Sequence, residues 1–158
     1  MIKYIVKILA ILMLVILQIA IISKIAIWGI IPNLILILSI CLILRDRFED
    51  GFLVALLGGL MMDLSSSLHF GLFTLIFLAI LAVIYFYLLK FFPAPNWLTS
   101  LLIFGGSFLL LDLIISLLVG DWSWQEILKD IIINSLWGGI IYLIVQRIVQ
   151  SKEEIKLT

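Results

Sequence analysis

The feature that most constrains this chain is the succession of apolar runs between residues 4 and 145, broken only by short polar stretches. A helix needs about 20 mainly apolar residues to cross a bilayer, and several of these runs are close to that length. Charged residues make up 13% of the 158 residues, whereas soluble domains carry roughly 25%. Because such a chain cannot cover its surface with polar groups, we expect lipid to be its solvent.

The apolar runs predict an all-α integral membrane bundle of about six transmembrane helices, forming a single domain over residues 1–150. A short charged cytoplasmic tail that frays is expected at 151–158. Pro32 removes a backbone donor, so the second helix either kinks there or begins at that residue. The charged residues 45–50 are expected to form a surface loop, and the third run is short for a bilayer. The expected helices are about Tyr4–Ile22, Ile25–Leu44, Gly51–Leu64, Leu68–Leu89, Leu98–Val119 and Ile127–Val145.

The Lys and Arg residues are distributed unequally between the two faces of this bundle. One face would carry Lys3, Lys7, Arg45, Arg47, Lys90, Arg147, Lys152 and Lys156, and the other only Lys24 and Lys129. Because basic residues near membrane helices concentrate on the cytoplasmic side, we predict that both termini are cytoplasmic. Trp122 and Trp124 then lie at the outer interface, where tryptophan is enriched.

The composition argues against several classes of function. The formal net charge is zero, so nucleic acid is not an expected partner. The single cysteine, Cys41, forbids an intramolecular disulfide, offers no metal cluster and is interpreted as a small buried hydrophobe. The chain also lacks a nucleophile–base pair and a phosphate-cradling loop. We therefore predict no enzymatic activity, no catalytic residue, no metal and no cofactor.

The third run carries small residues at helical spacing. Gly51, Ala55, Gly58 and Gly59 share one broad face with Asp63. Small side chains let a second helix approach closely inside a membrane. That second helix belongs either to a partner protein, which would dock in a groove here, or to the same bundle; both alternatives are kept.

Asp63 lies near the outer end of this helix, where a charged group should face protein or water. Three roles are open for its carboxylate. It accepts hydrogen bonds from the backbone of the following SSSLH turn and caps the fourth helix, it pairs with a polar group of a partner, or it acts in transport. His69 lies six residues further on, and a lone Asp and His at this separation do not predict catalysis.

A second acidic residue, Asp112, shares a face of the fifth run with Gly105. One interpretation is a hydrogen bond inside the bundle to a group such as Asn134 or Trp137. The other is an acid that faces a partner or a ligand. The candidate partner-binding residues from the two helices are Gly51, Ala55, Gly58, Gly59, Asp63, Gly105 and Asp112.

The order of these features resembles a known family. Pro32 opens the second helix, a charged loop follows, and the third helix carries a G-x6-G-G-x3-D-L core from Gly51 to Leu64. A turn of small residues and Gly71 then precede a new helix. This order, together with the length and the number of spans, resembles the rod-shape-determining MreD family of small bacterial inner-membrane proteins.

The resemblance implies a non-enzymatic scaffold in the bacterial cytoplasmic (inner) membrane, in the cell-elongation machinery that builds peptidoglycan. The implied partners are an MreC-like single-pass membrane protein, the actin-like MreB and the glycosyltransferase–transpeptidase pair, besides the lipid bilayer. The MreD fold is similar to that of the substrate-binding subunits of energy-coupling-factor vitamin transporters, which are the alternative. The polar residues expected outside the membrane, 65–69 and 121–129, do not by themselves predict a vitamin pocket.

The topology predicts opposite accessibility for two positions on a Cys41→Ser background. We expect Arg47→Cys to react with a membrane-impermeant thiol reagent only after the cell is opened, and Trp122→Cys to react in intact spheroplasts. The mass shift of the labelled protein on a gel is the measurement. Labelling of position 47 from the periplasmic side contradicts the topology.

Overall fold

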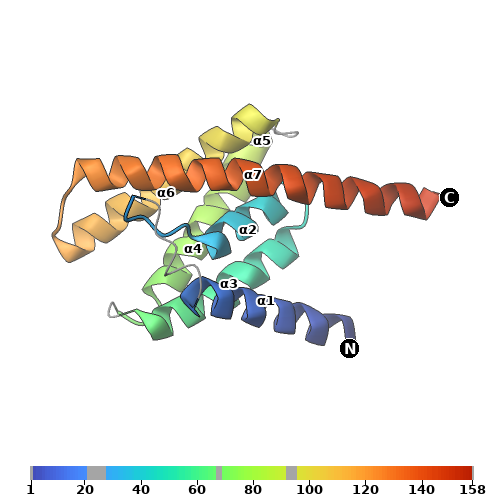
Figure 1. Cartoon of the computed structure of the whole chain (residues 1–158), viewed down its shortest axis with the longest axis horizontal. Helices are drawn as coiled ribbons and strands as arrows, with labels where there is room; N and C mark the ends of the chain where they lie inside the picture. Colours follow the sequence, from blue (N-terminus) through green and yellow to red (C-terminus); the bar gives the residue numbers. More distant parts are fainter. Residues whose placement is uncertain (1, 21–27, 67–68, 92–95, 158) are drawn as a thin grey trace.

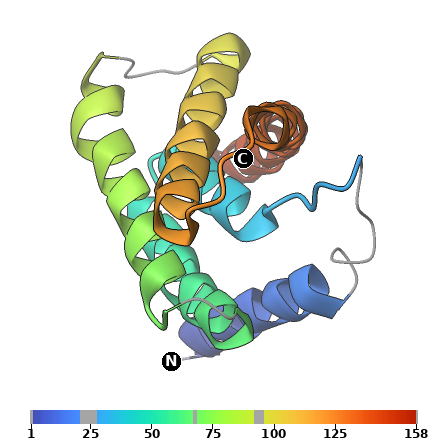
Figure 2. The ribbon, with the colours of Figure 1, turned by 90° about the vertical axis from the view of Figure 1, so that its left-hand side faces the viewer.

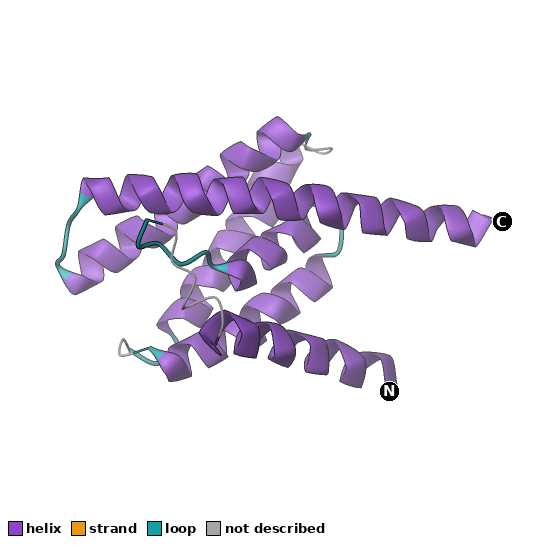
Figure 3. Cartoon of the chain, viewed as in Figure 1, coloured by secondary structure: helices purple, strands orange, loops and turns teal. Residues whose placement is uncertain are grey.

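The computed structural model describes residues 2–20, 28–66, 69–91 and 96–157. Every regular element in these ranges is a helix (Figure 3), so the all-α expectation is confirmed for this part of the chain. The elements α4, η2 and α5 follow one another without a break and form one continuous rod. The helices are α1 (Ile2–Ala20), α2 (Leu34–Ile43), α3 (Phe48–Ser65), α4 (Leu72–Val83), the π-helix η2 (Ile84–Leu88), α5 (Leu89–Phe91), α6 (Trp97–Val119) and α7 (Trp124–Leu157).

Three rods in the described part of the chain are long and apolar enough to cross a membrane, namely Leu72–Phe91, Trp97–Val119 and Trp124–Arg147. Two further apolar helical stretches, Ile8–Gln18 and Leu34–Ile43, are shorter. The chain is therefore a multi-pass membrane protein with three candidate spans in the ranges described, where the sequence predicted about six.

The centre of the bundle is α2, a helix of 10 residues. At 1.5 Å per residue it is about 15 Å long, roughly half the thickness of a bilayer's hydrocarbon core. It contacts α1, α3, α4 and α7 (Figure 2), and Ile35, Leu36, Ile37 and Ile40 in it have 0% exposed area. Seven of its ten residues are buried, so α2 forms the core of the fold.

The expectation that the second apolar run forms a full spanning helix is wrong for the described part of that run. The helix begins only at Leu34, and residues 28–33 are turn and irregular backbone. Pro32 cannot donate a backbone hydrogen bond, and Asn33 acts as the N-cap by accepting one from the N–H of Leu36 at 3.1 Å. Of the two alternatives, a kink or a helix start, the start is the one observed. Residues 25–27 lie outside the described ranges.

The third helix is longer than the sequence predicted. It begins at Phe48 rather than at Gly51, so only residues 45–47 of the expected surface loop lie outside a helix. Glu49 and Asp50 occupy its first turn, where acidic side chains interact favourably with the positive end of the helix dipole. Its 18 residues give a length of about 27 Å, close to the thickness of the hydrocarbon core.

The helices α6 and α7 pair along a hairpin closed by residues 120–123. A Cβ on Gly138 would lie 2.6 Å from the ring of Phe104, and a Cβ on Gly139 would lie 2.9 Å from Leu101. Only glycine allows the two helices to approach this closely. These two glycines therefore serve helix packing.

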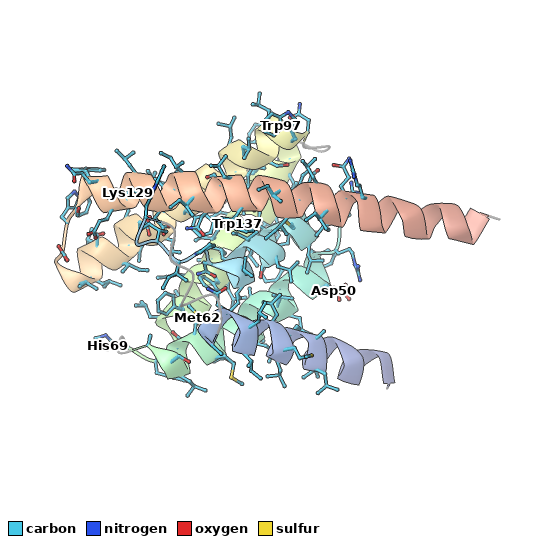
Figure 4. All side chains as sticks on the ribbon, viewed as in Figure 1. Asp50, Met62, His69, Trp97, Lys129 and Trp137 are labelled. Carbon is cyan, nitrogen blue, oxygen red and sulfur yellow. The ribbon has the colours of Figure 1, made fainter. Side chains whose placement is uncertain are left out.

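The two ends of the chain lie toward the same side of the bundle (Figure 1). We call this side, with the turn at 45–47, the inner end, and the opposite side, with residues 69–71 and the loop 120–123, the outer end. Figure 4 labels Asp50 near the inner end and His69 near the outer end. The prediction of a frayed tail at 151–158 is wrong for its described part, because α7 continues as a helix to Leu157. The Lys, Glu and Leu residues of this segment are strong helix formers.

Candidate functional site

Two of the α3 glycines lie against α2. A Cβ on Gly51 would be 2.8 Å from the side chain of Ile43 and 2.9 Å from the carbonyl oxygen of Ser39. A Cβ on Gly58 would collide with the side chain of Ile35. Both glycines are buried. They allow α3 to lie directly on the central helix, which is the close approach that small residues permit in membrane bundles.

Gly59 lies on a different side of α3 and faces α4. A Cβ here would be 2.7 Å from the Cα of Thr74 and 3.1 Å from its backbone nitrogen. Ala55 has 0% exposed area. The single small-residue face that the sequence predicted is therefore divided between two helices of the same chain. Internal packing is the alternative that the structure shows for these residues, and docking of a partner on them stays a prediction.

Asp63 is 3% exposed and joins the end of α3 to the start of α4. Its Oδ1 accepts a hydrogen bond from the N–H of Phe73 at 2.7 Å. Its Oδ2 accepts one from the N–H of Thr74 at 3.2 Å and one from the Thr74 hydroxyl at 2.6 Å. The capping role is confirmed, and the described donors belong to the first turn of α4. A carboxylate is also favoured at a helix N-terminus by the helix dipole.

His69 is not among the described hydrogen-bond donors to the Asp63 carboxylate. Its side chain is exposed, at the outer end of the bundle (Figure 4). Among the described residues, no group of three or more His, Cys, Asp or Glu side chains is arranged to hold a metal ion. The chemistry of this stretch is therefore that of a helix junction.

The start of α2 is held by a side chain from another helix. Gln18 of α1 is 4% exposed. Its Nε2 donates a hydrogen bond to the carbonyl oxygen of Pro32 at 2.8 Å, and its Oε1 accepts one from the N–H of Leu34 at 3.0 Å. The first N–H groups of a helix have no partner within the helix, so this amide supplies one of the missing acceptors.

A second amide, from α7, acts at the same place. Asn134 is 1% exposed, and its Oδ1 accepts a hydrogen bond from the N–H of Asn33 at 2.8 Å. Its Nδ2 donates to the carboxylate of Asp130 at 2.9 Å and to the carbonyl oxygen of that residue at 3.1 Å. The polar network therefore runs from α1 through the start of α2 to α7. We call it the α2 clamp and define it by Gln18, Asn33, Asn134 and Asp130.

The predicted α6 candidates face α7. Gly105 is half-buried, with Ser135 of α7 at 3.4 Å from a Cβ position. Asp112 is half-buried and lies against the carboxyl group of Asp130. Of the two example partners for Asp112, Asn134 and Trp137, the first bonds to Asp130 instead. The Oδ2 atom of Asp112 is buried and has no hydrogen-bond partner among the described residues.

A cavity of about 280 Å³ opens beside this pair at the outer end of α6 and α7. Its described lining includes four acidic side chains and two serines and contains no basic side chain, while Lys129 is exposed on α7 (Figure 4). Such a lining is suited to cations and hydrogen-bond donors. The polar lining residues are Asp112, Ser116, Asp121, Ser123, Glu126 and Asp130.

A second cavity, of about 290 Å³, lies on the other side of the α2 clamp, between the start of α2 and the α3–α4 junction. Gln18, Asn33, Ser65 and Ser66 are among its lining residues, together with the apolar Phe73. Clamp residues thus line both cavities, Asp130 the first and Gln18 and Asn33 the second.

Sequence reasoning missed Gln18, Asn33 and Asp130 as members of one site. Two signals were present in the sequence: Gln18 is a strongly polar residue inside the first apolar run, and Asp130 lies one helical turn before Asn134. Neither signal gives the partner of the residue, because the partners lie up to 101 positions away.

Comparisons with protein-family models, with curated proteins and with solved structures gave no match to this chain. The resemblance to the MreD family therefore stays a prediction.

The Gly59 contact predicts a specific packing defect. In Gly59→Leu, the added side chain meets the backbone of Thr74, which cannot move aside, and overpacking typically costs about 1–3 kcal/mol. We expect less folded protein and a lower melting temperature, measured by size-exclusion chromatography of detergent-solubilised protein after heating. The matched control is Gly106→Leu, because a Cβ on Gly106 meets nothing within 4 Å. Equal abundance and stability of the two variants contradict the close contact.

The α2 clamp predicts a second defect. In Asn134→Leu, the N–H of Asn33 loses its acceptor inside the bundle, and an unsatisfied buried donor costs about 1–3 kcal/mol. We expect a lower unfolding free energy in detergent, measured by denaturant titration followed by tryptophan fluorescence. The exposed Gln125→Leu on the same helix is the control and should unfold like the wild type. Unchanged stability of Asn134→Leu would refute the clamp.

Proposed function

We propose that this chain is a non-enzymatic membrane scaffold of the bacterial cell-elongation machinery that binds an MreC-like single-pass membrane protein. The main support for the proposal is where the residues of the MreD-like motif lie in the structure. Its glycines set the close contacts of α3 with α2 and α4, and its aspartate caps α4. The spaced glycines and the aspartate thus act in one packing unit, α2–α3–α4, as residues that define a family's fold would.

The surfaces of the bundle support a role in binding other membrane helices. Leu75 on α4 is 68% exposed, and Leu102 and Leu117 on α6 are 70% and 76% exposed. Lipid and the helix of a single-pass partner are the surroundings that such side chains fit. Gly105 and Asp112 are half-buried on the same helix and stay candidate partner-binding residues.

The proposal includes the finer topology. Both termini are cytoplasmic, the inner end faces the cytoplasm, and the protein resides in the bacterial inner membrane. The support is the concentration of Lys and Arg near the helix ends of one face. In this topology both of the cavities that clamp residues line lie toward the outside, where a periplasmic segment of a partner has access to them.

The alternative is a substrate-binding subunit of an energy-coupling-factor vitamin transporter. One observation favours it, namely the cavity of about 280 Å³ with its four acidic side chains at the outer end. Ligand pockets typically measure about 300–1,000 Å³, so this cavity is near the lower limit and would fit a small cationic substrate.

Depletion of the protein in its rod-shaped host separates the two functions. A scaffold of elongation fixes where new wall is built, so we expect rod-shaped cells to become round as the protein disappears, measured by phase-contrast microscopy. Wild-type protein supplied in trans should restore the rods, and Gly106→Leu, the variant with free space around it, should restore them equally. Co-purification of an MreC-like protein with the tagged chain is the accompanying measurement.

The opposite outcome is equally specific. If depleted cells keep their shape but lose uptake of one vitamin, the transporter alternative is correct. Cells that keep both their shape and their vitamin uptake contradict both functions.

A further inference from the structure

The central helix α2 is tied to α7 at both of its ends. At its start, the N–H of Asn33 donates a hydrogen bond to Oδ1 of Asn134 at 2.8 Å, as part of the α2 clamp. In the turn that follows α2, Nη2 of Arg45 donates a hydrogen bond to the carbonyl oxygen of Gln146 at 3.2 Å. This second bond lies beside the turn that marks the inner end. Between the two bonds α2 lies alongside α7 (Figures 1 and 2).

The two bonds have the same spacing in the sequence. Asn33 and Asn134 are 101 positions apart, and so are Arg45 and Gln146. The two segments therefore run in the same direction and keep one register over about 18 Å of α7, at 1.5 Å per residue. A single bond would leave a pivot about which two apolar helices can splay or slide. Two bonds at the ends of the contact fix both the angle between the helices and their register.

The Arg45 side chain is committed to this contact. Its Nε is buried and has no hydrogen-bond partner among the described residues, so the described bonding of the guanidinium is to Gln146. A hydrogen bond from a charged donor is stronger than one from a neutral donor. Beyond Gln146, α7 continues as a helix to Leu157, about 16 Å further. We call residues 147–157 the α7 extension. The direction in which it leaves the bundle depends on where Arg45 holds the helix.

We propose that α2 and α7 form one rigid unit that couples the α2 clamp to the α7 extension at the inner end. Packed, rigid helices transmit a displacement between distant sites. If the bond at Asn134 is lost, the helices pivot about the bond at Arg45, and the extension swings. Binding that displaces Asn134 therefore changes the direction of the extension. By reciprocity, binding to the extension changes the free energy of binding at the clamp by the same amount. The coupling is a property of the fold and does not depend on the identity of a partner.

Distances between two spin labels on the full-length chain test the coupling. On a Cys41→Ser background, one label is placed at position 49, exposed in the first turn of α3, and the other at position 150 in the α7 extension. Pulsed electron paramagnetic resonance in nanodiscs gives the distribution of their separation. We expect a narrow distribution for the parent protein and a broader one for Arg45→Met, which removes the bond beside the extension. Asn134→Leu removes only the distant bond, about 18 Å along α7, and should broaden the distribution as well.

Two matched variants of exposed residues on α7 serve as controls. Arg147→Met removes a basic side chain next to Gln146, and Gln125→Leu changes a residue near the start of the helix. Both should keep the narrow distribution. The proposal is overturned if Asn134→Leu leaves the distribution unchanged, if Arg45→Met does so, or if either control broadens it as much.

A reciprocal measurement decides if Asn134→Leu does not fold. Labels are then placed at the exposed positions 64, at the end of α3, and 125, at the start of α7. Arg45→Met lies at the other end of α2 and should broaden this distribution, whereas Arg147→Met should not. A distribution that Arg45→Met leaves as narrow as in the parent protein shows that the two ends of α2 move independently and contradicts the rigid unit.

Discussion

A helix that begins inside an apolar bundle must find acceptors for its first backbone N–H groups, and this constraint organises the protein. The helix is α2, whose start follows Pro32 and Asn33. The N–H groups of Leu34 and Leu36 donate to Gln18 from α1 and to the side chain of Asn33. The N–H of Asn33, the N-cap residue, donates to Asn134 from α7. Each unsatisfied group would cost several kcal/mol in lipid, so the relative positions of α1, α2 and α7 follow from these bonds.

The start of α4 is stabilised in the same way, by a polar side chain from another helix. Asp63, at the end of α3, satisfies the first turn of α4 with two backbone hydrogen bonds and one to the Thr74 hydroxyl. The glycines of α3 complement it, because they bring the backbone of α3 within contact of α2 and α4. Polar caps hold the helix ends and close glycine contacts hold the helix bodies. The polar side chains at the starts of α2 and α4 thus form hydrogen bonds within the fold.

At the outer end, the acidic residues Asp112 and Asp130 are not fully hydrogen-bonded within the described part of the fold. Asp130 is anchored to Asn134, but Asp112 keeps one buried oxygen without a hydrogen-bond partner among the described residues. Buried acceptors are nearly always satisfied in native proteins, by water or a ligand if not by the protein. The cavity between α1, α2 and α3 at the inner end has a mainly apolar lining. The two ends of the bundle are therefore chemically different surfaces.

The amino-acid sequence by itself determined that the chain is an all-α membrane protein, because composition and the length of apolar runs do not depend on context. It also indicated the helix start near Pro32 and the capping role of Asp63, since these depend on local geometry. It did not determine that α2 is a half-length core helix, that Gly59 and Gly58 face different neighbours, or that Gln18 and Asn134 meet at Asn33. Hydrophobic periodicity carries little information when nearly every side of a helix is apolar. Only the tertiary structure decided these contacts, because the identity of a hydrogen-bond partner depends on how distant helices pack.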